Sequence, residues 1–156
     1  STANADEILS IDPDALFLSN GPGDPALLDG PISMIQSLLD KLPILGICLG
    51  HQLITHALGG KTVKMKFGHH GSNHPVKDLK NGRVFVTAQN HGFMSDPESL
   101  PEDAEIWMVN ANDGSIEGLI SEKHRAMSVQ FHPEAAPGPE DAVYIFDRFI
   151  EVSYEA

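Results

Sequence analysis

Basic residues are scarce in this sequence. Lysine and arginine together number 10 among 156 residues, against 22 aspartates and glutamates, and the formal net charge is −12. Proteins that bind a nucleic-acid backbone rely on clustered Lys and Arg side chains to neutralise its phosphates. The charge balance therefore argues against a nucleic-acid partner and is typical of a soluble protein with an acidic surface.

Cysteine is nearly absent, and long apolar runs are missing. Cys48 is the single cysteine, so no disulfide can form within the chain. No apolar run approaches the roughly 18 residues of a membrane-spanning helix, and no signal peptide is visible at the N-terminus. We therefore expect a cytoplasmic protein with no membrane partner. The sequence begins at Ser1 without a methionine, which is expected of a processed chain or a fragment.

The composition predicts one globular domain over residues 1–156. Hydrophobic residues make up 41% of the sequence, which is enough to bury a sizeable core. In the first half, short apolar runs alternate with helical patterns. The expected elements are a short helix at Asp6–Ser10, a strand at Ala15–Ser19, a helix from Pro31 to Leu42, a buried strand at Ile44–Cys48 and a helix at Gly50–Leu58.

The second half is typical of strands separated by Gly-, Asn- and Pro-rich loops, with a helix at the end. The expected strands are Lys61–Lys66, Arg83–Gln89, Glu105–Asn110, Ser115–Ile120 and Arg125–Phe131. The terminal helix is expected to have Pro139 at its start and a buried face formed by Val143, Phe146, Phe149 and Ile150. Alternating strands and helices followed by strand pairs predict an α/β sheet with an antiparallel extension.

Cys48 stands where a predicted strand runs directly into a predicted helix. Gly46 and Gly50 flank it two residues away on each side. Small neighbours of this kind let the backbone turn sharply and expose a nucleophile, and the start of a helix favours the thiolate by lowering the thiol pKa. The backbone N–H of Leu49 would point to the place where an oxyanion forms. An isolated cysteine is more often inert and buried, but this context favours a nucleophile.

The segment His132-Pro133-Glu134 predicts a base oriented by a carboxylate. Pro133 keeps His132 out of the helical region, and in an extended chain residues two apart point to the same side. We therefore expect the imidazole to lie next to the carboxylate, as the base for a cysteine nucleophile. Taken alone, such a pair is as often structural as catalytic.

Two further segments could bind a ligand or a metal. Asn20–Gly23 follows a strand, and its glycines would let backbone N–H groups approach a ligand, although a plain loop is an equal alternative. It lacks the pattern of a phosphate loop, so nucleotide binding is not expected. In Gly68–His74 the histidines do not sit on a predicted helix, and no Cys or acidic residue lies within the segment. We therefore expect no metal site at His69, His70 or His74.

These motifs together resemble a known family. The combination of Gly46–Gln52 with His132–Glu134 resembles the class I, or triad-type, glutamine amidotransferases. Within that family, the stretches Lys64–Val76, Gln89–Phe93 and His132–Pro139 are similar to the carbamoyl-phosphate synthetase small subunits. The resemblance runs from about residue 6 to the end of the terminal helix, so the chain is expected to be a single amidotransferase domain.

The resemblance implies a fold and a set of roles. The fold would be a flavodoxin-like, mostly parallel sheet flanked by helices, with an antiparallel extension. Cys48 would attack the side-chain amide of L-glutamine, with His132 and Glu134 completing the triad. Backbone N–H groups of Leu49 and Gly21 would form the oxyanion hole. The other positions that match substrate-holding residues of the family are Gly23, Gln52, Asn90, Gly92 and Phe93.

The resemblance also implies a partner. Ammonia would pass to a large synthetase subunit, which uses ATP and metal ions, so no cofactor is expected in this chain. The family normally has a strand, a helix and a second strand before the Asp6 region, so the domain is expected to be N-terminally incomplete. Two alternatives stay open: another triad-type amidotransferase, such as one serving GMP or anthranilate synthesis, or a non-catalytic interaction module. The choice between pyrimidine and arginine synthesis is open as well.

Overall fold

A single mixed sheet runs through the protein. The computed structural model describes residues 4–135 and 143–154, and its sheet has seven strands in the order β1-β2-β7-β6-β5-β3-β4. The strands are β1 (Leu16–Leu18), β2 (Ile44–Ile47), β3 (Thr62–Asp78), β4 (Val84–Ser95), β5 (Glu105–Asn110), β6 (Ile116–Ser121) and β7 (Ala126–Val129).

The parallel part of the sheet is smaller than expected. β1, β2 and β7 are parallel neighbours, whereas β7, β6, β5, β3 and β4 follow one another in antiparallel pairs. The expectation of an α/β sheet with an antiparallel extension is confirmed, but within the described residues the sheet is not mostly parallel. The reason is that the antiparallel strands come from the whole second half of the chain, where short loops replace crossover helices.

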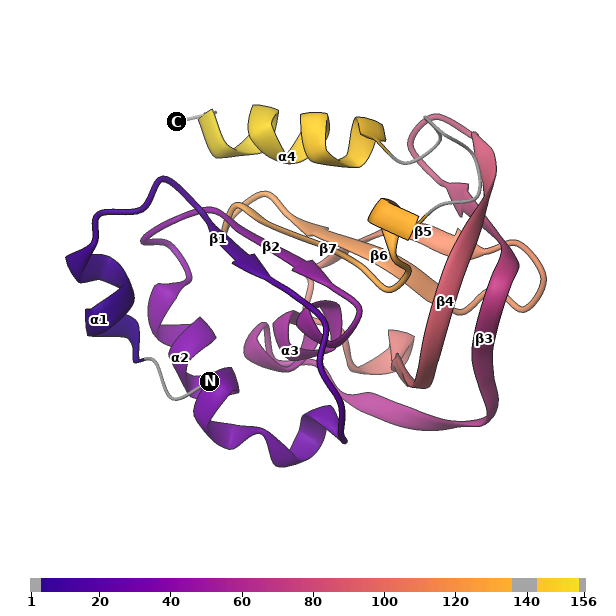
Figure 1. Cartoon of the computed structure of the whole chain (residues 1–156), viewed down its shortest axis with the longest axis horizontal. Helices are drawn as coiled ribbons and strands as arrows, with labels where there is room; N and C mark the ends of the chain where they lie inside the picture. Colours follow the sequence, from indigo (N-terminus) through magenta and orange to yellow (C-terminus); the bar gives the residue numbers. More distant parts are fainter. Residues whose placement is uncertain (1–3, 136–142, 155–156) are drawn as a thin grey trace.

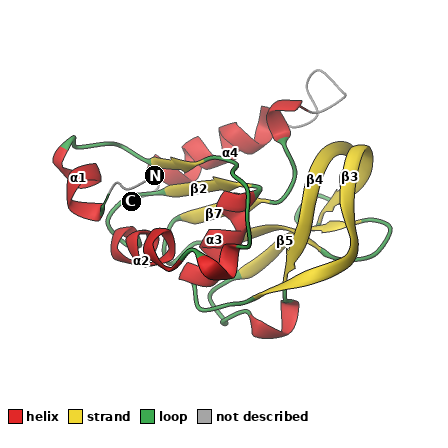
Figure 2. Ribbon diagram, turned by 60° about the horizontal axis from the view of Figure 1, so that its bottom comes forward, coloured by secondary structure: helices red, strands yellow, loops and turns green. Residues whose placement is uncertain are grey.

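Helices cover both faces of the parallel strands (Figures 1 and 2). On one face lie α2 (Asp29–Leu38) and α3 (Leu49–Ala57), with α1 (Ala5–Ser10) packed against α2, and on the other lies α4 (Val143–Tyr154). At the start of α1, the Glu7 N–H donates to the Asn4 side chain at 2.9 Å, a capping box that stabilises this short helix. Within the described ranges, no helix has the length and hydrophobicity to cross a membrane.

The strand β2 is buried on both faces, as its continuous apolar sequence predicts. Ile44 packs with Ile35 and Ile54 in the cluster under α2 and α3. Leu45, the next residue, points the other way and joins the cluster that Phe149 of α4 covers. Alternation along a strand thus divides the core into two layers, and β2 is common to both.

The ends of two helices differ from the expectation. α2 begins at Asp29 rather than at Pro31, because a proline inside the first turn removes only an N–H that has no helical partner. It ends at Leu38, and Asp40 then adopts a positive φ of 70° that turns the chain, so Leu42 is buried from a loop rather than from the helix.

The terminal helix buries a different side from the one predicted. Ile145, Phe149 and Val152 of α4 are buried, at the i, i+4, i+7 spacing of one helix face. Phe149 was expected there, but Ile150 is 53% exposed, so its assignment to the core is wrong. Pro139 lies outside the described residues, and the Val143 side chain is likewise not described.

The strands β3 and β4 extend far beyond the predicted Lys61–Lys66 and Arg83–Gln89, and they include the histidine-rich segment. Gly68 and Gly71 take positive φ angles of 69° and 105°, and the pairing shifts register at both places. Glycine tolerates these angles where other residues would be strained. Only the last residues of β3, Val76–Asp78, pair with β5. The rest of the β3–β4 hairpin therefore departs from the sheet as a two-stranded ribbon, as Figure 1 shows.

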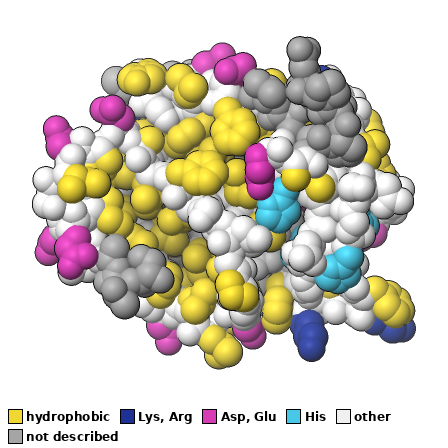
Figure 3. Space-filling view, in the orientation of Figure 1, with side chains coloured by type: hydrophobic (Ala, Val, Ile, Leu, Met, Phe, Trp, Pro, Cys, Tyr) yellow, Lys and Arg dark blue, Asp and Glu magenta, His cyan; other side chains and the backbone are white. Residues whose placement is uncertain are grey.

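The opposite edge of the sheet carries exposed apolar side chains. β1 is the edge strand, and Phe17 on it is 49% exposed and stacks on Phe146 of α4 with ring centroids 6.5 Å apart. Figure 3 shows hydrophobic side chains gathered over β1 and between β1 and α4.

The close packing around Gly50 predicts that a single added methyl group destabilises the fold. A Cβ on Gly50 would lie 2.8 Å from the Leu18 Cβ and against the Leu18 carbonyl oxygen, which belongs to the backbone of β1 and cannot move alone. Gly50→Ala should therefore lower the free energy of unfolding by about 1–3 kcal/mol, measured by denaturant titration.

The matched control is Gly30→Ala in α2, where an added Cβ meets no atom within 4 Å. Alanine is the better helix former, so this variant should be unchanged or more stable by about 0.5–1 kcal/mol. Equal destabilisation by the two substitutions would contradict the packing argument.

Candidate active site

The predicted site residues gather at the carboxyl edge of the parallel strands. β1, β2 and β7 are in register there, with Leu18 opposite Gly46 and Ile47 opposite Val129. The residues that follow these strands therefore come to the same edge, where open α/β sheets usually bind their ligands. Cys48 directly follows β2 and Gln130 directly follows β7.

Cys48 sits on the strained turn that the two glycines predict. Its φ and ψ are 55° and −106°, which is an unusual backbone conformation for a residue with a side chain, and α3 begins at the next residue. A Cβ on Gly46 would lie 2.5 Å from the Gly50 carbonyl carbon and oxygen. The Cys48 N–H donates to Val129 O at 2.9 Å, which holds the turn against β7. The strand–turn–helix prediction is confirmed.

The Cys48 thiol is buried and is a weak acid in this state. Burial raises its pKa to about 11, a backbone hydrogen bond from Leu49 acts to lower it, and the nearby Glu134 carboxylate raises it further. The sulfur lies 3.9 Å from both Asn90 O and Gln130 Nε2. The first N–H of the helix does act to lower the thiol pKa, as expected, but desolvation outweighs it and the net pKa is raised.

His132 and Glu134 form the predicted pair. The His132 Nδ1 atom lies 2.9 Å from Glu134 Oε1, and the His132 N–H donates to Ala88 O of β4 at 2.9 Å. The contact is confirmed, although Pro133–Ala135 form a 3-10 turn and not the extended chain from which it was inferred. Among the described residues, His132 makes no hydrogen bond with the Cys48 sulfur.

A pocket of about 460 Å³ opens beside Cys48. Its volume suits a small ligand. All of the positions predicted to bind substrate line it: Gly21, Gly23, Leu49, Gln52, Asn90, Gly92 and Phe93. They come from the loop after β1, from the start of α3 and from β4, which are distant in sequence, so the fold brings the predicted set together.

Gln52 connects α3 to β4 and to Gln130, the residue that follows β7. Its Nε2 donates to Phe93 O at 3.0 Å and to Gln130 Oε1 at 3.1 Å. Gln130 is fully buried and its own amide reaches the Cys48 sulfur. The side chain predicted to hold substrate therefore also fixes the position of β4 relative to α3 and β7.

The two predicted oxyanion donors have different hydrogen-bond acceptors. Leu49 directs its N–H toward the Cys48 sulfur. The Gly21 N–H instead donates to the Asn20 side-chain oxygen at 2.8 Å. A substrate oxyanion would therefore have to displace the Asn20 side chain to use the second donor.

Sequence reasoning missed Gln130 and gave no role to His70 and His91, which line the pocket. Both histidines lie inside family-like stretches, but His70 was weighed only as a metal ligand and His91 was not singled out. Gln130 had a detectable signal, because it lies two residues before His132 and follows a strand that is buried along its whole length.

The family follows from the whole chain. A family model described as "Glutamine amidotransferase class-I" matches residues 1–152, and the chain belongs to this family. Curated relatives are more specific. The chain is 55% identical over 145 residues to the carbamoyl phosphate synthase small chain of Akkermansia muciniphila, covering 93% of this chain and 39% of that protein. It is 53% identical to the chloroplastic small chain of Oryza sativa, covering 95% and 33%. It is 49% identical to that of Archaeoglobus fulgidus, covering 97% and 42%.

Solved structures agree with the fold. The chain superposes on a protein from Thermoplasma acidophilum named as a GMP synthase subunit with a TM-score of 0.80 and 25% identity, covering 97% of this chain and 77% of that one. It superposes on a glutamine amidotransferase from Thermotoga maritima with a TM-score of 0.65 and 21% identity, covering 86% and 64%. The expected class, an α/β sheet flanked by helices, is confirmed. The chain spans only 33–42% of the length of the three small chains above.

The raised thiol pKa predicts how Cys48 reacts with an alkylating agent. Only the thiolate reacts, and with a pKa of about 11 its fraction should grow nearly tenfold with each pH unit below that value. The rate of iodoacetamide labelling, followed by mass spectrometry, should therefore keep rising between about pH 7 and pH 10.

Cys48→Ser provides the blank for this measurement, since no other cysteine is present. A labelling rate that levels off below about pH 8 would show that the thiol of the free chain is already activated.

Proposed function

We propose that this chain is the glutamine-hydrolysing domain of a carbamoyl-phosphate synthetase small chain. The observation that carries the proposal is the position of Cys48 beside the pocket, at the same sheet edge as the hydrogen-bonded pair of His132 and Glu134. Identities of 49–55% to carbamoyl phosphate synthase small chains support the assignment.

The first chemical step is activation of the thiol. Because the free thiol has a raised pKa, Cys48 needs a base when substrate is present, and His132 is the candidate at this edge. Glu134 accepts a hydrogen bond from the Nδ1–H of His132, which leaves the Nε2 atom of His132 to take the thiol proton. The carboxylate also stabilises the imidazolium that results. The thiolate then attacks the side-chain amide carbon of glutamine.

The second step is stabilisation of the tetrahedral oxyanion. The N–H of Leu49, which contacts the sulfur in the free chain, is one donor. Gly21 supplies the other once the oxyanion replaces the Asn20 side chain as its acceptor. Donors that point to the developing charge lower the barrier because they need no reorganisation during the reaction.

Collapse of this intermediate releases ammonia and leaves a γ-glutamyl thioester on Cys48. His132 donates the proton to the leaving amine, and water then hydrolyses the thioester to glutamate. In the complete enzyme the ammonia passes to a large synthetase chain that combines it with bicarbonate and ATP. The thiol chemistry needs no cofactor of its own in this chain. A single free cysteine suits a reducing compartment, so we place the enzyme in the cytoplasm.

One other amidotransferase has a specific observation in its favour, the TM-score of 0.80 with the protein named as a GMP synthase subunit. A shared backbone defines the class and not the ammonia acceptor. The sequence identity to that protein is 25%, against 55% to a carbamoyl phosphate synthase small chain. The carbamoyl phosphate synthase assignment is therefore preferred.

The nucleophile is tested in the complete synthetase. Cys48→Ser should reduce glutamine-dependent carbamoyl phosphate formation by about 1,000-fold or more. Formation from added ammonium should be unchanged, because the acceptor chemistry lies elsewhere. If the serine variant keeps glutaminase activity, Cys48 is not the nucleophile.

Single-turnover kinetics distinguish the role of the base from the role of the carboxylate that orients it. His132→Asn should slow thioester formation by about 10²–10⁴-fold, because proton transfer and activation of the thiol are both lost. Glu134→Gln should have a smaller effect, since the amide still accepts the hydrogen bond from Nδ1.

His124→Asn is the matched control for these variants. His124 also lies between carboxylates, 2.7 Å from Asp40 and 3.0 Å from Asp103, but it does not line the pocket. Its loss should leave the rate unchanged. A larger loss in Glu134→Gln than in His132→Asn would reverse the two assigned roles.

A further inference from the structure

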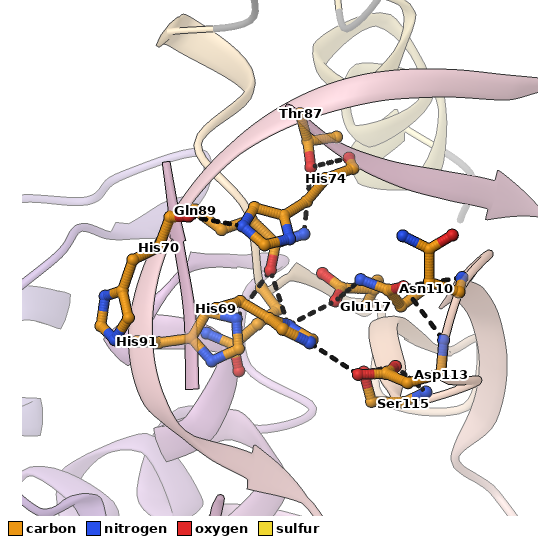
Figure 4. A network of polar contacts seen from close by, with 12 residues as sticks. His69, His70, His74, Thr87, Gln89, His91, Asn110, Asp113, Ser115 and Glu117 are labelled. Carbon is orange, nitrogen blue, oxygen red and sulfur yellow. Dashed lines mark hydrogen bonds and ion pairs between the residues drawn. The ribbon is translucent and has the colours of Figure 1, made fainter. Parts of the chain in front are cut away.

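A second cluster of buried polar side chains lies between the β3–β4 ribbon and the sheet (Figure 4). His69 of β3 pairs directly opposite His91 of β4. Gln89 lies on the same side of β4 as His91, two residues away, and Glu117 comes from β6. Each is at least 93% buried, and Glu117 is completely buried.

The lone pairs of these four side chains converge. His69 Nδ1 is 3.1 Å from Gln89 Oε1 and 3.4 Å from Glu117 Oε1. His91 Nε2 is 2.7 Å from the same Gln89 oxygen. One ligand atom from each of His69, His91 and Glu117 lies within 4.8 Å of the others. Figure 4 shows these side chains pointing toward a common centre.

The cluster has too few protons for its acceptors. His91 faces Phe93 O with Nδ1 and Gln89 Oε1 with Nε2, and His69 faces Asp113 with Nε2 and two oxygens with Nδ1. A neutral imidazole has one N–H, so satisfying every contact would require two buried imidazolium rings whose centroids are 5.1 Å apart. Glu117 Oε2 is buried and has no hydrogen-bond partner.

Turning over the Gln89 amide moves the conflict to Thr87. Gln89 Nε2 now donates to Thr87 Oγ1 at 3.0 Å, and Thr87 gives its own proton to His74 O at 2.7 Å. A turned amide would donate to both imidazoles, but its oxygen would need the Thr87 proton, and His74 O would then lose that donor. Glu117 Oε2 has no hydrogen-bond partner in either orientation.

The outer contacts are those of metal-binding histidines. His69 Nε2–H donates to Asp113 Oδ2 at 2.7 Å, and His91 Nδ1–H donates to Phe93 O at 2.8 Å. Ligating histidines usually donate their second N–H to a carboxylate or a backbone carbonyl in this way, which fixes the ring and its tautomer. Asp113 is itself held by the Ser115 hydroxyl at 2.6 Å. With its inner nitrogen deprotonated, each ring would present one lone pair to the centre.

We propose that His69 Nδ1, His91 Nε2, the Glu117 carboxylate and Gln89 Oε1 bind one divalent transition-metal ion, with zinc the best match. Tetrahedral zinc with ligands at about 2.0–2.2 Å keeps them roughly 3.3 Å apart. Two of the separations here, 3.4 and 3.1 Å, already fit, and the 2.7 Å separation needs a small shift. The ligand atoms of His69, His91 and Glu117, which lie within 4.8 Å of one another, would have to close to the same spacing. Two imidazole ligands disfavour calcium and magnesium, which prefer oxygen.

The site differs from the one weighed on the sequence. That expectation concerned three histidines close in sequence, of which only His69 takes part. His70 Nδ1 bonds Asn90 Oδ1 at 2.8 Å, and His74 Nε2 bonds the His70 carbonyl at 2.7 Å. The acidic ligand that the segment lacks is Glu117, which follows His69 by 48 residues and reaches it only through the fold.

The ion is structural and acts on the pocket indirectly. It fastens the ribbon, which pairs with β5 only at Val76–Asp78, to β6. The same ribbon carries Asn90 and Phe93 of the pocket wall, and His91 holds the Phe93 carbonyl. Removal of the ion should therefore loosen the wall that faces substrate.

The test is direct metal binding by the chain. After treatment with a chelator and dialysis, the chain should take up one equivalent of Zn²⁺, measured by elemental mass spectrometry and by competition with a chromophoric chelator. Zinc should raise the melting temperature. Co²⁺ in its place should give the visible absorption of a tetrahedral site with nitrogen and oxygen ligands.

Three variants decide whether the ion sits in this cluster. Glu117→Gln keeps the shape and loses the charge, so the zinc affinity should fall by about 100-fold and the Co²⁺ spectrum should disappear. Asp113→Asn removes the carboxylate that holds His69 from outside the cluster, so the zinc affinity of this variant should fall by about 10–100-fold. His124→Asn, which removes a histidine held by two other carboxylates, should bind as the parent does.

The proposal is overturned if the chelator-treated chain binds less than about 0.1 equivalents at micromolar zinc, or if Glu117→Gln and His124→Asn bind equally. Should Glu117→Gln fail to fold by circular dichroism, the comparison of Asp113→Asn with His124→Asn decides. None of these readouts depends on glutamine hydrolysis, so failure here leaves the proposed function untouched.

Discussion

The structure depends on a close approach of three backbones around Cys48. Gly46 in β2, Gly50 in α3 and the Leu18 carbonyl of β1 come so near one another that neither glycine could carry a methyl group. This contact lets the chain turn from strand to helix within one residue of positive φ. It also directs the Leu49 N–H to the sulfur and orients α3 so that Gln52 reaches both β4 and β7. The pocket is therefore a consequence of how tightly a helix can start against a parallel sheet.

Burial has opposite effects on the Cys48 thiolate and on the hydrogen bonds of a bound substrate. It keeps the thiol protonated, because a thiolate would lose its hydration and would also face the Glu134 carboxylate. The same low-dielectric surroundings strengthen every hydrogen bond that a substrate makes. A nucleophile that ionises only when a substrate and a base are in place is protected against unproductive alkylation and oxidation, since both reactions need the thiolate.

Local patterns predicted the parts of the site that are local. The glycines around Cys48, the His132–Glu134 pair and the two-sided burial of β2 all follow from spacing over a few residues. The failures concern longer range. The β3–β4 ribbon has Gly, His and Asn where strands usually alternate apolar and polar residues, so its length was missed. Gln130 acts through a partner 82 residues away, and Glu117 through one 48 residues away. The thiol pKa could not be inferred because desolvation depends on the complete packing and not on the helix that follows.

In mechanical terms, the β3–β4 ribbon is held to the rest of the protein at separated points along its length. At its base, three residues of β3 pair with β5. Midway, the main chain of Ala88 holds His132. Near its end, Ser95 bonds His51 and Thr55 of α3 at 2.9 and 2.7 Å. Asn90 and Phe93 lie between the last two of these contacts, and within that stretch the Gln52 amide also holds the Phe93 carbonyl at 3.0 Å. The precision with which this wall meets a substrate is therefore set by a few polar contacts, and a change at those outside the pocket would alter the compliance of the site while leaving its composition the same.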